Sequence, residues 1–414
     1  MKFALFLAIV LTLLAMGGPA RAESEPAVSS ASPASRVLSG EAWEQFCDRL
    51  KAAGKMITSD GVPDTELDRA EGYRYLLASL AASIDASLYR SDLDDAHLYY
   101  NVTKFRSPAM PSADARYLGA EITGKGLYRL SGTLGNSPHI TIQEYSGVES
   151  QGSFDLRKAA DAQGRFSITI GGPSQDADWM ELSPQASLLY FREYFSDWDA
   201  ARSSELLLER LDRQERGTPL APAILARVLE ETATKLEQEL PYWKGRLDQI
   251  RARQKNLLGP PGTLGGVGLG DIIYGTGWFD LEPEQALLIE LSPPEAAHWS
   301  FQLGNYWGEF LDFASYTSSL NGKQAKPSSD GGYRIVIARE DPGVPNWLDT
   351  AGHREGMIFY RYHLAKTTPT PSMKLVSISD LVDLLPADTP RITPEERRSD
   401  IARRRAHVAR RWAP

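Results

Sequence analysis

The sequence of 414 residues is long enough for two domains of ordinary size. Hydrophobic residues make up 42% of it and charged residues 24%, which are the proportions of a soluble globular protein. The net charge of −9 argues against nucleic acid as a partner, because nucleic-acid-binding proteins carry a basic surface.

Residues 1–22 have the pattern of a secretory signal peptide. Lys2 supplies the positive start, residues 3–16 supply the apolar core, and residues 20–22 supply a small-x-small cleavage signal. The core is shorter than the roughly 20 apolar residues that a membrane-spanning helix needs, which disfavours an uncleaved anchor. We therefore expect a periplasmic or secreted protein with no transmembrane segment after cleavage.

Residues 23–38 are rich in Ser, Ala and Pro and predict a flexible leader, and residues 39–91 predict a helical segment. A first helix is expected at Glu41–Met56; it contains the single cysteine, Cys47, which we expect to be a small core residue. A second helix is expected to begin at an N-cap, Asp64. Its apolar residues recur at three- and four-residue spacing and predict one buried face: Leu67, Tyr73, Leu76, Leu77, Leu80, Ile84 and Leu88.

Residues 92–198 change to a β pattern, and residues 199–257 return to a helical one. Short apolar runs separated by glycine-containing turns are typical of a β-sandwich or jelly roll. These runs are Leu118–Ile122, Leu127–Leu130, Ile140–Tyr145, Phe166–Ile170 and Leu188–Phe191. The helical stretch predicts a linker of two helices, at Asp199–Glu215 and Ala221–Gln254, the second ended or kinked by Pro241.

Residues 258–388 predict a second β-rich domain. Ala286–Leu291 is a short apolar run, and Trp299–Leu303 alternates apolar and polar residues, as a half-buried strand does. In Met357–Tyr362 the odd-numbered residues share one face and the even-numbered residues share the other. The loop before this last strand contains two prolines and three glycines, so its backbone is tightly defined.

Residues 389–414 predict a basic C-terminal helix. Thr393, Pro394 and Glu396 form a capping box, and eight arginines lie between Arg391 and Arg411. The helix would dock on anionic lipid or lipopolysaccharide, or it would pack on the protein while its arginines meet acidic residues. We favour packing, because the apolar stripe is thin for membrane binding.

The order of several segments resembles domain-of-unknown-function family 1214, preceded by a 1254-like N-terminal half. The segments are Pro293-Pro294, HWS at 298–300, DGGYRIVI at 330–337, PNWLDTAGHREG at 345–356, FYRY at 359–362, and residues 111–132 and 188–199 upstream. The resemblance covers most of the mature chain and implies exported bacterial proteins, but no activity. It implies an α+β fold of two β-sandwich or jelly-roll-like halves with an N-terminal helical segment and a helical linker.

The loop before the last predicted strand holds residues suited to catalysis. His353 titrates near neutral pH and Asp349 would orient it, so we expect these two as acid and base, with Arg361 on the following strand. The alternative is structural. Asn346 and Asp349 would then cap the turn, Trp347 would plug the end of the sandwich, and His353 would satisfy a loop carbonyl.

Aromatic residues are frequent in the second half and would suit a sugar ring or an apolar polycyclic ligand if a cleft exposed them. Gly304 and Gly308 would permit close backbone approach in the middle of this group. If buried, the same aromatic residues would simply form the core. The expected ligand-binding residues are Trp299, Asn305, Tyr306, Trp307, Asn346 and Trp347.

Motifs for cofactors and metals are incomplete in this sequence. The glycine-rich run at 259–277 lacks the Gly-Lys-Ser/Thr of a phosphate-binding loop, and no zinc motif or Gly-x-Ser-x-Gly elbow occurs. The Asp92–Asp95 stretch lacks the glycine and glutamate of an EF-hand. We expect no metal and leave the cofactor open. Carboxylates available for glycoside hydrolysis are Glu290, Glu309, Asp312 and Asp349.

Two functions follow from these patterns. The first is a periplasmic hydrolase or lyase acting on a carbohydrate-like or apolar small molecule, in a cleft between Gly304–Glu309 and the loop at 346–355. The second is a non-catalytic ligand-binding or envelope-associated β-sandwich module. An enzyme predicts a titratable His or carboxylate facing the cleft, whereas a binding module predicts aromatics and amides there. A homo-oligomer is compatible with either, because sheet edges pair readily.

Overall fold

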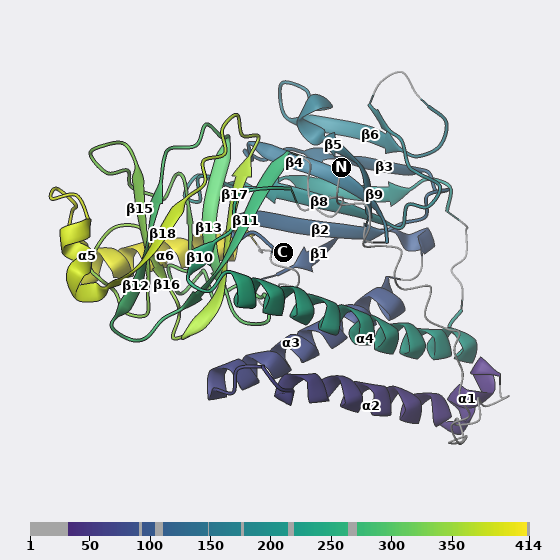
Figure 1. Ribbon diagram of the computed structural model, residues 1–414. Coiled ribbons are helices and arrows are strands. Elements are labelled where there is room, and N and C mark those ends of the chain that lie inside the picture. Colours follow the sequence, from purple (N-terminus) through teal and green to yellow (C-terminus); the bar gives the residue numbers. More distant parts are fainter. Residues whose placement is uncertain are drawn as a thin grey trace, which may run out of the picture.

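The computed structural model describes residues 32–90, 93–103, 111–147, 149–174, 178–213, 219–263 and 271–411. Two β-sandwiches lie side by side above a layer of helices (Figure 1). The expected α+β fold with two β-rich halves is therefore confirmed. The predicted signal peptide and most of the predicted leader lie outside the described residues.

The first sandwich packs a five-stranded sheet against a four-stranded sheet. Alternation decides which side chains face inward: Phe166, Ile168 and Ile170 enter the core beside Leu130. Each of the five predicted β runs overlaps a strand. The larger sheet has the order β1 (Tyr99–Val102), β2 (Ala115–Glu121), β8 (Leu188–Tyr194), β4 (His139–Ser146), β5 (Glu149–Asp155). The smaller has the order β7 (Trp179–Met180), β6 (Arg165–Ile170), β3 (Tyr128–Thr133), β9 (Glu205–Arg210).

The second sandwich is built in the same way. Its five-stranded sheet has the order β10 (Leu257–Leu258), β11 (Ile272–Asp280), β17 (Glu355–His363), β13 (His298–Gly304), β14 (Ser319–Asn321). The other sheet has the order β16 (Trp347–Asp349), β15 (Tyr333–Ala338), β12 (Gln285–Leu291), β18 (Ser372–Ser377). The predicted two faces of β17 are confirmed. Ile358, Tyr360 and Tyr362 enter the sandwich core, while Met357 and Phe359 face the helices.

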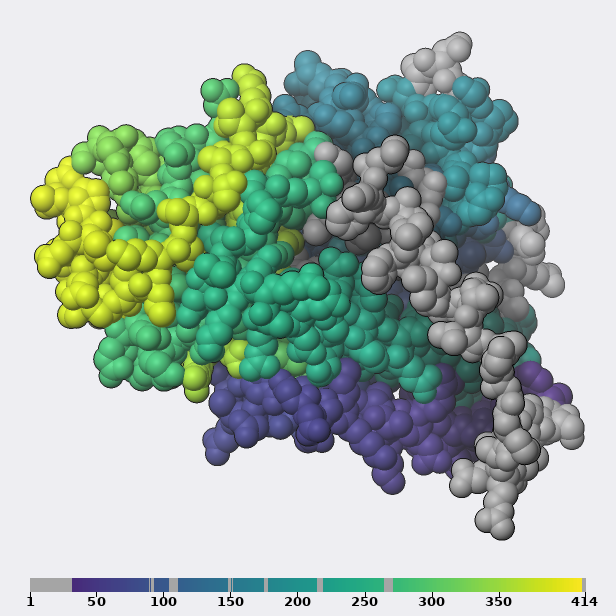
Figure 2. All heavy atoms as spheres, viewed as in Figure 1, coloured from purple at the N-terminus to yellow at the C-terminus, as the bar shows by residue number. Residues whose placement is uncertain are grey.

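The helical layer consists of α1 (Pro33–Ser39), α2 (Glu41–Gly54), α3 (Glu66–Ile84) and α4 (Pro222–Arg253). Helix α4 links the two sandwiches, and α2 and α3 pack along it, as the adjoining bands of Figure 2 show. An apolar cluster joins this layer to the second sandwich: Leu236, Leu240 and Leu247 of α4 contact the same cluster as Trp278 and Trp307.

Several details of the predicted helices are wrong. Residues 33–38 of the predicted flexible leader belong to α1. The N-cap of α3 is Thr65 and not Asp64, because the Thr65 hydroxyl accepts a hydrogen bond of 3.1 Å from the Asp68 backbone N–H. Pro241 does not end α4, which continues beyond it under the packing of its apolar side chains.

The buried face of α3 also differs from the predicted stripe. Leu67, Tyr73 and Leu77 are exposed. Leu76 of the predicted stripe is buried, and the other buried residues of the helix are Asp68, Glu71, Gly72, Tyr75 and Ser83. Gly72 lets the helix approach the Trp307 indole, where an added Cβ would come within 2.6 Å of the ring, and this contact turns two carboxylates toward the protein interior. Cys47, expected in the core, is exposed because its neighbour Phe46 takes the inward position on α2.

The predicted helix at Asp199–Glu215 is wrong. Residues 205–210 form strand β9, which pairs antiparallel with β3 and places Leu208 opposite Leu130 in the first core. Leucine and glutamate favour helices locally, but pairing with an existing sheet outweighs that preference. The helical linker is therefore α4, preceded by residues 214–218, which lie outside the described residues.

The C-terminal region forms α5 (Ile378–Leu384) and α6 (Pro394–Arg411). Packing of α6 on the protein is confirmed, since Arg404, His407, Val408 and Arg411 are buried. Some arginines pair with acids, and others bind backbone carbonyls, as Arg404 does with Phe313. Among the described residues, no helix is long and apolar enough to cross a membrane.

The predicted capping box of α6 is confirmed and yields a first testable expectation. The Thr393 hydroxyl accepts the Glu396 backbone N–H at 3.2 Å, and the Glu396 carboxylate accepts the Thr393 backbone N–H at 2.7 Å. Thr393→Ala should lower the free energy of unfolding by about 1 kcal/mol, measured by urea denaturation. Thr370→Ala, at an exposed loop threonine, is the matched control; an equal loss there would refute the capping role.

Candidate functional site

The sequence-predicted residues Asn305 and His353 meet at a buried glutamate, Glu71 of α3. His353 Nε2 lies 2.8 Å from Glu71 Oε2, and Asn305 Nδ2 donates to the same oxygen at 2.9 Å. The other ring nitrogen of His353 lies 2.8 Å from the Thr350 carbonyl oxygen. Burial opposes charge on the imidazole, but Glu71 outweighs burial and raises the pKa of His353.

A second carboxylate, Glu309, shares the donors of Glu71. Asn305 Nδ2 donates to Glu309 at 3.0 Å, and Arg74 Nη2 contacts Glu309 at 2.8 Å and Glu71 at 3.1 Å. Burial raises the pKa of Glu309 above its usual range. Burial also acts most strongly on Glu71, but His353, Arg74 and Asn305 together outweigh it, so the pKa of Glu71 is lowered. Two neighbouring carboxylates with pKa values pushed apart are a pattern found in acid–base catalysis.

The carboxylates and the imidazole of this polar cluster are buried, whereas the Arg74 side chain that contacts both carboxylates is 51% exposed. Glu71, Glu309 and His353 are 6%, 3% and 5% exposed, so a substrate would have to displace packed side chains to reach them. The predicted open surface of Tyr306 and Trp307 is wrong, because both are buried in the cluster that joins the helices to the second sandwich. The alternative interpretation, that these aromatic residues are core, is confirmed.

The expected partnership of Asp349 with His353 is not formed. Asp349 Oδ1 accepts the Ala351 backbone N–H at 2.8 Å, which is the turn-capping role of the structural alternative. Burial raises the pKa of Asp349 to about 6. Glu71 binds the imidazole in its place, and the sequence pattern missed it because Glu71 lies 282 positions away on a helix with a different predicted face.

Arg361 lies in a separate buried contact. Its Nη2 donates to the Pro111 carbonyl at 2.9 Å, and its Nη1 donates to Gln302 Oε1 at 3.2 Å. The guanidinium also lies 3.9 Å from the centre of the Phe359 ring. Arg361 therefore joins strand β17 to the segment that enters the first sandwich, and it does not contact His353.

The remaining predicted residues have structural roles as well. Trp299 is buried against Tyr333, with ring centres 4.8 Å apart. Asn346 adopts a left-handed backbone conformation (φ 56°), and its Nδ2 donates to the Lys326 carbonyl at 2.8 Å. Trp347 donates from Nε1 to the Ala338 carbonyl at 3.0 Å. Asn346 and Trp347 nevertheless reach the wall of an open cavity, so two of the six predicted ligand-binding residues lie at a pocket.

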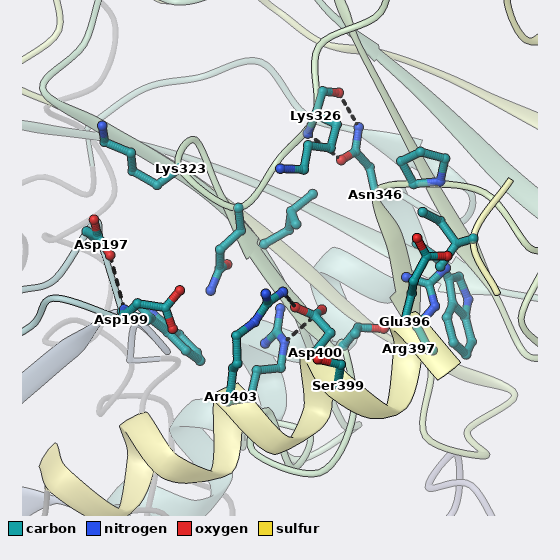
Figure 3. Close-up of a pocket in the computed structure, with 18 of the residues that line it drawn as sticks. Asp197, Asp199, Lys323, Lys326, Asn346, Glu396, Arg397, Ser399, Asp400 and Arg403 are labelled. Atoms are coloured by element: carbon teal, nitrogen blue, oxygen red, sulfur yellow. Dashed lines mark hydrogen bonds and ion pairs between the residues drawn. The ribbon is translucent and has the colours of Figure 1, made fainter. Parts of the chain in front are cut away.

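This cavity, which we call the seam pocket, has a volume of about 540 Å³ and lies where the two sandwiches and α6 meet (Figure 3). Its walls come from residues 196–199 after β8, residues 317–326 around β14, residues 345–347 before and in β16, and one face of α6. No local stretch of sequence could reveal it, because these four segments are far apart in the chain.

The seam pocket is polar and carries both signs of charge. On the α6 side, Arg403 pairs with Asp400 at 2.7 Å, and Arg397 pairs with Asp341 at 3.0 Å. Asp197 accepts the Asp199 backbone N–H at 3.0 Å and so caps its own loop. These charged groups therefore already have partners within the protein.

Lys323 and Lys326 differ from the other cations of the pocket, Arg397, Arg403 and Arg404, which pair with Asp341 or Asp400. The two lysines lie across the cavity from α6 (Figure 3), and neither forms an ion pair with a residue that the structure describes. Asn346 fixes the base of Lys326, since its side chain binds the Lys326 carbonyl and accepts the Lys326 backbone N–H, each at 2.8 Å. The pocket thus offers two free ammonium groups on a defined backbone.

Within the described residues, no group of three or more His, Cys, Asp or Glu side chains is arranged to hold a metal ion. The stretch Asp92–Asp95 begins at a residue outside the described range, and the predicted glycine-rich run lies partly outside it, at 264–270.

Comparisons with known proteins support the fold and leave the activity open. No protein-family model matches the chain, and no curated protein matches it. The structure is similar to the crystal structure of an uncharacterised protein from Burkholderia cenocepacia, with a TM-score of 0.79 and 28% identity over 84% of this chain and 99% of that one. A protein from Vibrio parahaemolyticus matches with a TM-score of 0.43 and 12% identity over 72% of this chain and 100% of that one.

Proposed function

We propose that this chain is an exported, non-catalytic protein that binds a small carbohydrate-like molecule with an acidic group in the seam pocket. The observation that carries the proposal is the contrast between two sites. The groups suited to catalysis, Glu71, Glu309 and His353, are sealed, whereas the open pocket presents amides, indole edges and two free ammonium groups. Ligand sites commonly combine a few fixed polar groups with aromatic walls in this way.

The ligand class follows from the lining. Lys323 and Lys326 would bind a carboxylate, and the amides of Gln324 and Asn346 would bind hydroxyl groups. Trp347 supplies apolar wall area of the kind that sugar rings contact. A neutral apolar ligand fits less well, because it would leave the two lysines desolvated without a partner.

Export and family membership belong to the same proposal. The N-terminal pattern of residues 1–22 supports periplasmic or secreted location. The motif order supports membership of domain-of-unknown-function family 1214, with the 1254-like half in front. Seven residues of the resembling segments line the seam pocket: Ser196, Asp197, Trp198, Asp199, Pro345, Asn346 and Trp347.

The test is a thermal-shift screen of residues 23–414 against uronic acids, matching neutral sugars and simple carboxylates. Selective binding to the native state raises the melting temperature by mass action. Uronic acids should shift it more than neutral sugars do. The double variant Lys323→Ala/Lys326→Ala should weaken binding by about tenfold or more, because two charge-assisted contacts are lost.

Lys374→Ala provides the matched control, since Lys374 is an exposed lysine on β18, outside the pocket lining. Equal weakening by Lys374→Ala would show that the lysines act only through net charge. Binding of neutral sugars as tight as that of uronic acids would contradict the proposed role of the ammonium groups.

The competing proposal is a hydrolase or lyase acting on a carbohydrate-like or apolar small molecule. It is supported by Glu71 and Glu309, whose pKa values are pushed apart beside His353. An enzyme should convert a substrate from such a screen, and Glu309→Gln should abolish turnover while leaving ligand binding intact. Ligand that is bound but recovered unchanged supports the binding protein instead.

A further inference from the structure

A second cavity adjoins the seam pocket at the junction of the two sandwiches. It has a volume of about 260 Å³, and we call it the side cavity. Ser196, Asp197 and Lys323 line both cavities, so the two meet at these residues. The other walls of the side cavity come from the loop between β3 and β4, from Phe195 after β8 and from Ala297 before β13.

The two cavities together offer more space than one sugar ring needs. The seam pocket alone, at about 540 Å³, lies in the range of about 300–1,000 Å³ that is typical of pockets for drug-sized molecules. A single hexuronic acid is smaller than such molecules, and the side cavity adds further space beside it. A ligand of one ring would therefore leave part of this space to water, whereas a second, linked ring would occupy it.

The polar groups of the side cavity are held in place by the protein itself. The Asn136 side chain donates to the Ala200 carbonyl at 2.6 Å and accepts the Arg202 backbone N–H at 2.7 Å, which fixes the amide. The Ser196 hydroxyl lies 2.9 Å from His298 Nδ1. An amide and a hydroxyl have more hydrogen-bonding positions than these contacts use, so both can also bind sugar hydroxyl groups. Because the groups are already fixed, binding costs less entropy.

Asp197, at the border of the two cavities, is suited to a sugar hydroxyl group. Its Oδ1 accepts the backbone N–H groups of Asp199 and Ala200, at 3.0 Å and 3.2 Å. Its Oδ2 has no hydrogen bond or ion pair with any residue that the structure describes, and the side chain is exposed. This oxygen can accept a hydroxyl proton, whereas like charge would keep a ligand carboxylate away from it.

The charges of the two cavities favour different parts of a ligand. Lys326 lines the seam pocket and not the side cavity, so an acidic group is favoured in the seam pocket. Among the described residues that line the side cavity, Lys323 and Asp197 carry the charges, and these charges are opposite and equal. Figure 3 shows both on the side of the seam pocket away from Lys326 and Asn346. An uncharged sugar ring therefore suits the side cavity.

We propose that the ligand is an acidic oligosaccharide of at least two units, with a uronic acid in the seam pocket and a neutral sugar in the side cavity. The proposal rests on the proposed function of the seam pocket, and it adds the size of the ligand and the place of its second ring. Both sandwiches would contact the second ring, since the side cavity is walled by the β3–β4 loop of the first and by Ala297 of the second.

The test is calorimetric titration of residues 23–414 with glucuronic acid, with a disaccharide of glucuronic acid linked to xylose, and with the neutral disaccharide xylobiose. The acidic disaccharide should bind about tenfold more tightly than glucuronic acid, which is the gain expected from one or two further hydrogen bonds. This comparison uses the parent protein, so it decides the size of the ligand whether or not a variant folds.

Ala297→Trp should remove the gain, because Ala297 is exposed in the side cavity and an indole there would fill the space. The variant should bind glucuronic acid as the parent does, since Ala297 does not line the seam pocket. Ala162→Trp is the matched control, at an exposed alanine in the turn before β6 and outside the lining of both cavities. It should keep the full gain.

The outcomes separate this proposal from the function on which it rests. Equal affinity of the parent for glucuronic acid and for the acidic disaccharide would overturn the proposal and leave the seam pocket as a site for one acidic sugar. A gain that survives in Ala297→Trp would overturn the placement of the second ring. Xylobiose binding as tightly as the acidic disaccharide, or no binding of any of the three sugars, would overturn the proposal and the proposed function together.

Discussion

Replacing Trp307 with alanine is expected to lower the free energy of unfolding by about 3–5 kcal/mol. The indole is 2% exposed and lies against Gly72, Ile57 and Tyr75 of the helical layer, with the Tyr75 ring centre 5.8 Å away. Its Nε1 also donates to the Asp68 carbonyl at 3.1 Å. The variant would leave a cavity between the helices and the second sandwich, and it would lose the hydrogen bond from the indole to the Asp68 carbonyl. Urea denaturation followed by circular dichroism measures the loss.

Trp43→Ala is the control for this prediction. Trp43 lies on α2 in the same helical layer but is 59% exposed, so its loss should change stability by no more than about 0.5 kcal/mol. Similar losses for the two variants would contradict the assignment of Trp307 to the core. Ligand binding in the seam pocket should survive Trp307→Ala in the folded fraction, because Trp307 does not line that pocket.

The spacing of apolar residues predicted the buried face correctly where buried positions recur regularly along the chain. The two faces of β17 were predicted correctly, because each face meets a continuous apolar surface. The buried face of helix α3 was predicted wrongly, because a single glycine, Gly72, packs against Trp307 and sets the rotation of the helix. This rotation turns Asp68 and Glu71 inward. Strand β9 failed because pairing with β3 overrode the local preference of its residues.

The candidate sites were harder to predict than the fold for a related reason. Sequence spacing places Asp349 four positions before His353, but a turn uses Asp349 for its own backbone and leaves the imidazole to Glu71. The seam pocket likewise joins α6 to a loop of the first sandwich. The contact of Glu71 with His353 and that of α6 with this loop both depend on tertiary packing. In the sequence, only the polarity of the 345–356 loop indicated a site. Asn346 was found in this way, whereas Lys323 and Lys326 were not.

Three histidines gather at the junction of the two sandwiches and should make stability depend on pH. The ring of His363 at the end of β17 lies 4.9 Å from that of His298 and 4.1 Å from that of Tyr194, with His139 farther away at 6.1 Å. The nearest carboxylates are already engaged, Asp271 with His139 and Asp114 with His298. Neither ring nitrogen of His363 has a hydrogen-bond partner among the described residues.

Burial, reinforced by His298, His139 and Arg361, lowers the pKa of His363 well below its ordinary value. The native state therefore keeps this imidazole neutral, while the unfolded chain takes up a proton near pH 6.5. Stability from this group is complete above pH 6.5 and falls by about 1.4 kcal/mol per pH unit below it. Buried carboxyl groups with a raised pKa, such as Asp349 at about 6, stabilise the native state as the pH falls and so oppose the effect of His363. These groups are the same in the parent and in a variant at His363, so the difference in unfolding free energy between the two proteins reports the histidine alone.

His363→Phe should therefore gain stability relative to the parent as the pH falls from 7.5 to 5. The unfolding free energy of the variant minus that of the parent should rise by about 2 kcal/mol over that range. Phenylalanine takes up no proton in the unfolded state, so only the parent loses stability through this position. Urea denaturation at half-unit pH steps measures it. Tyr362→Phe on the same strand removes a hydroxyl that donates to the Pro369 carbonyl at 2.9 Å, and its cost should stay constant over this range. If the difference in unfolding free energy between His363→Phe and the parent did not change with pH, His363 would be protonated in the native state. The assignment of a neutral imidazole to this position would then be wrong.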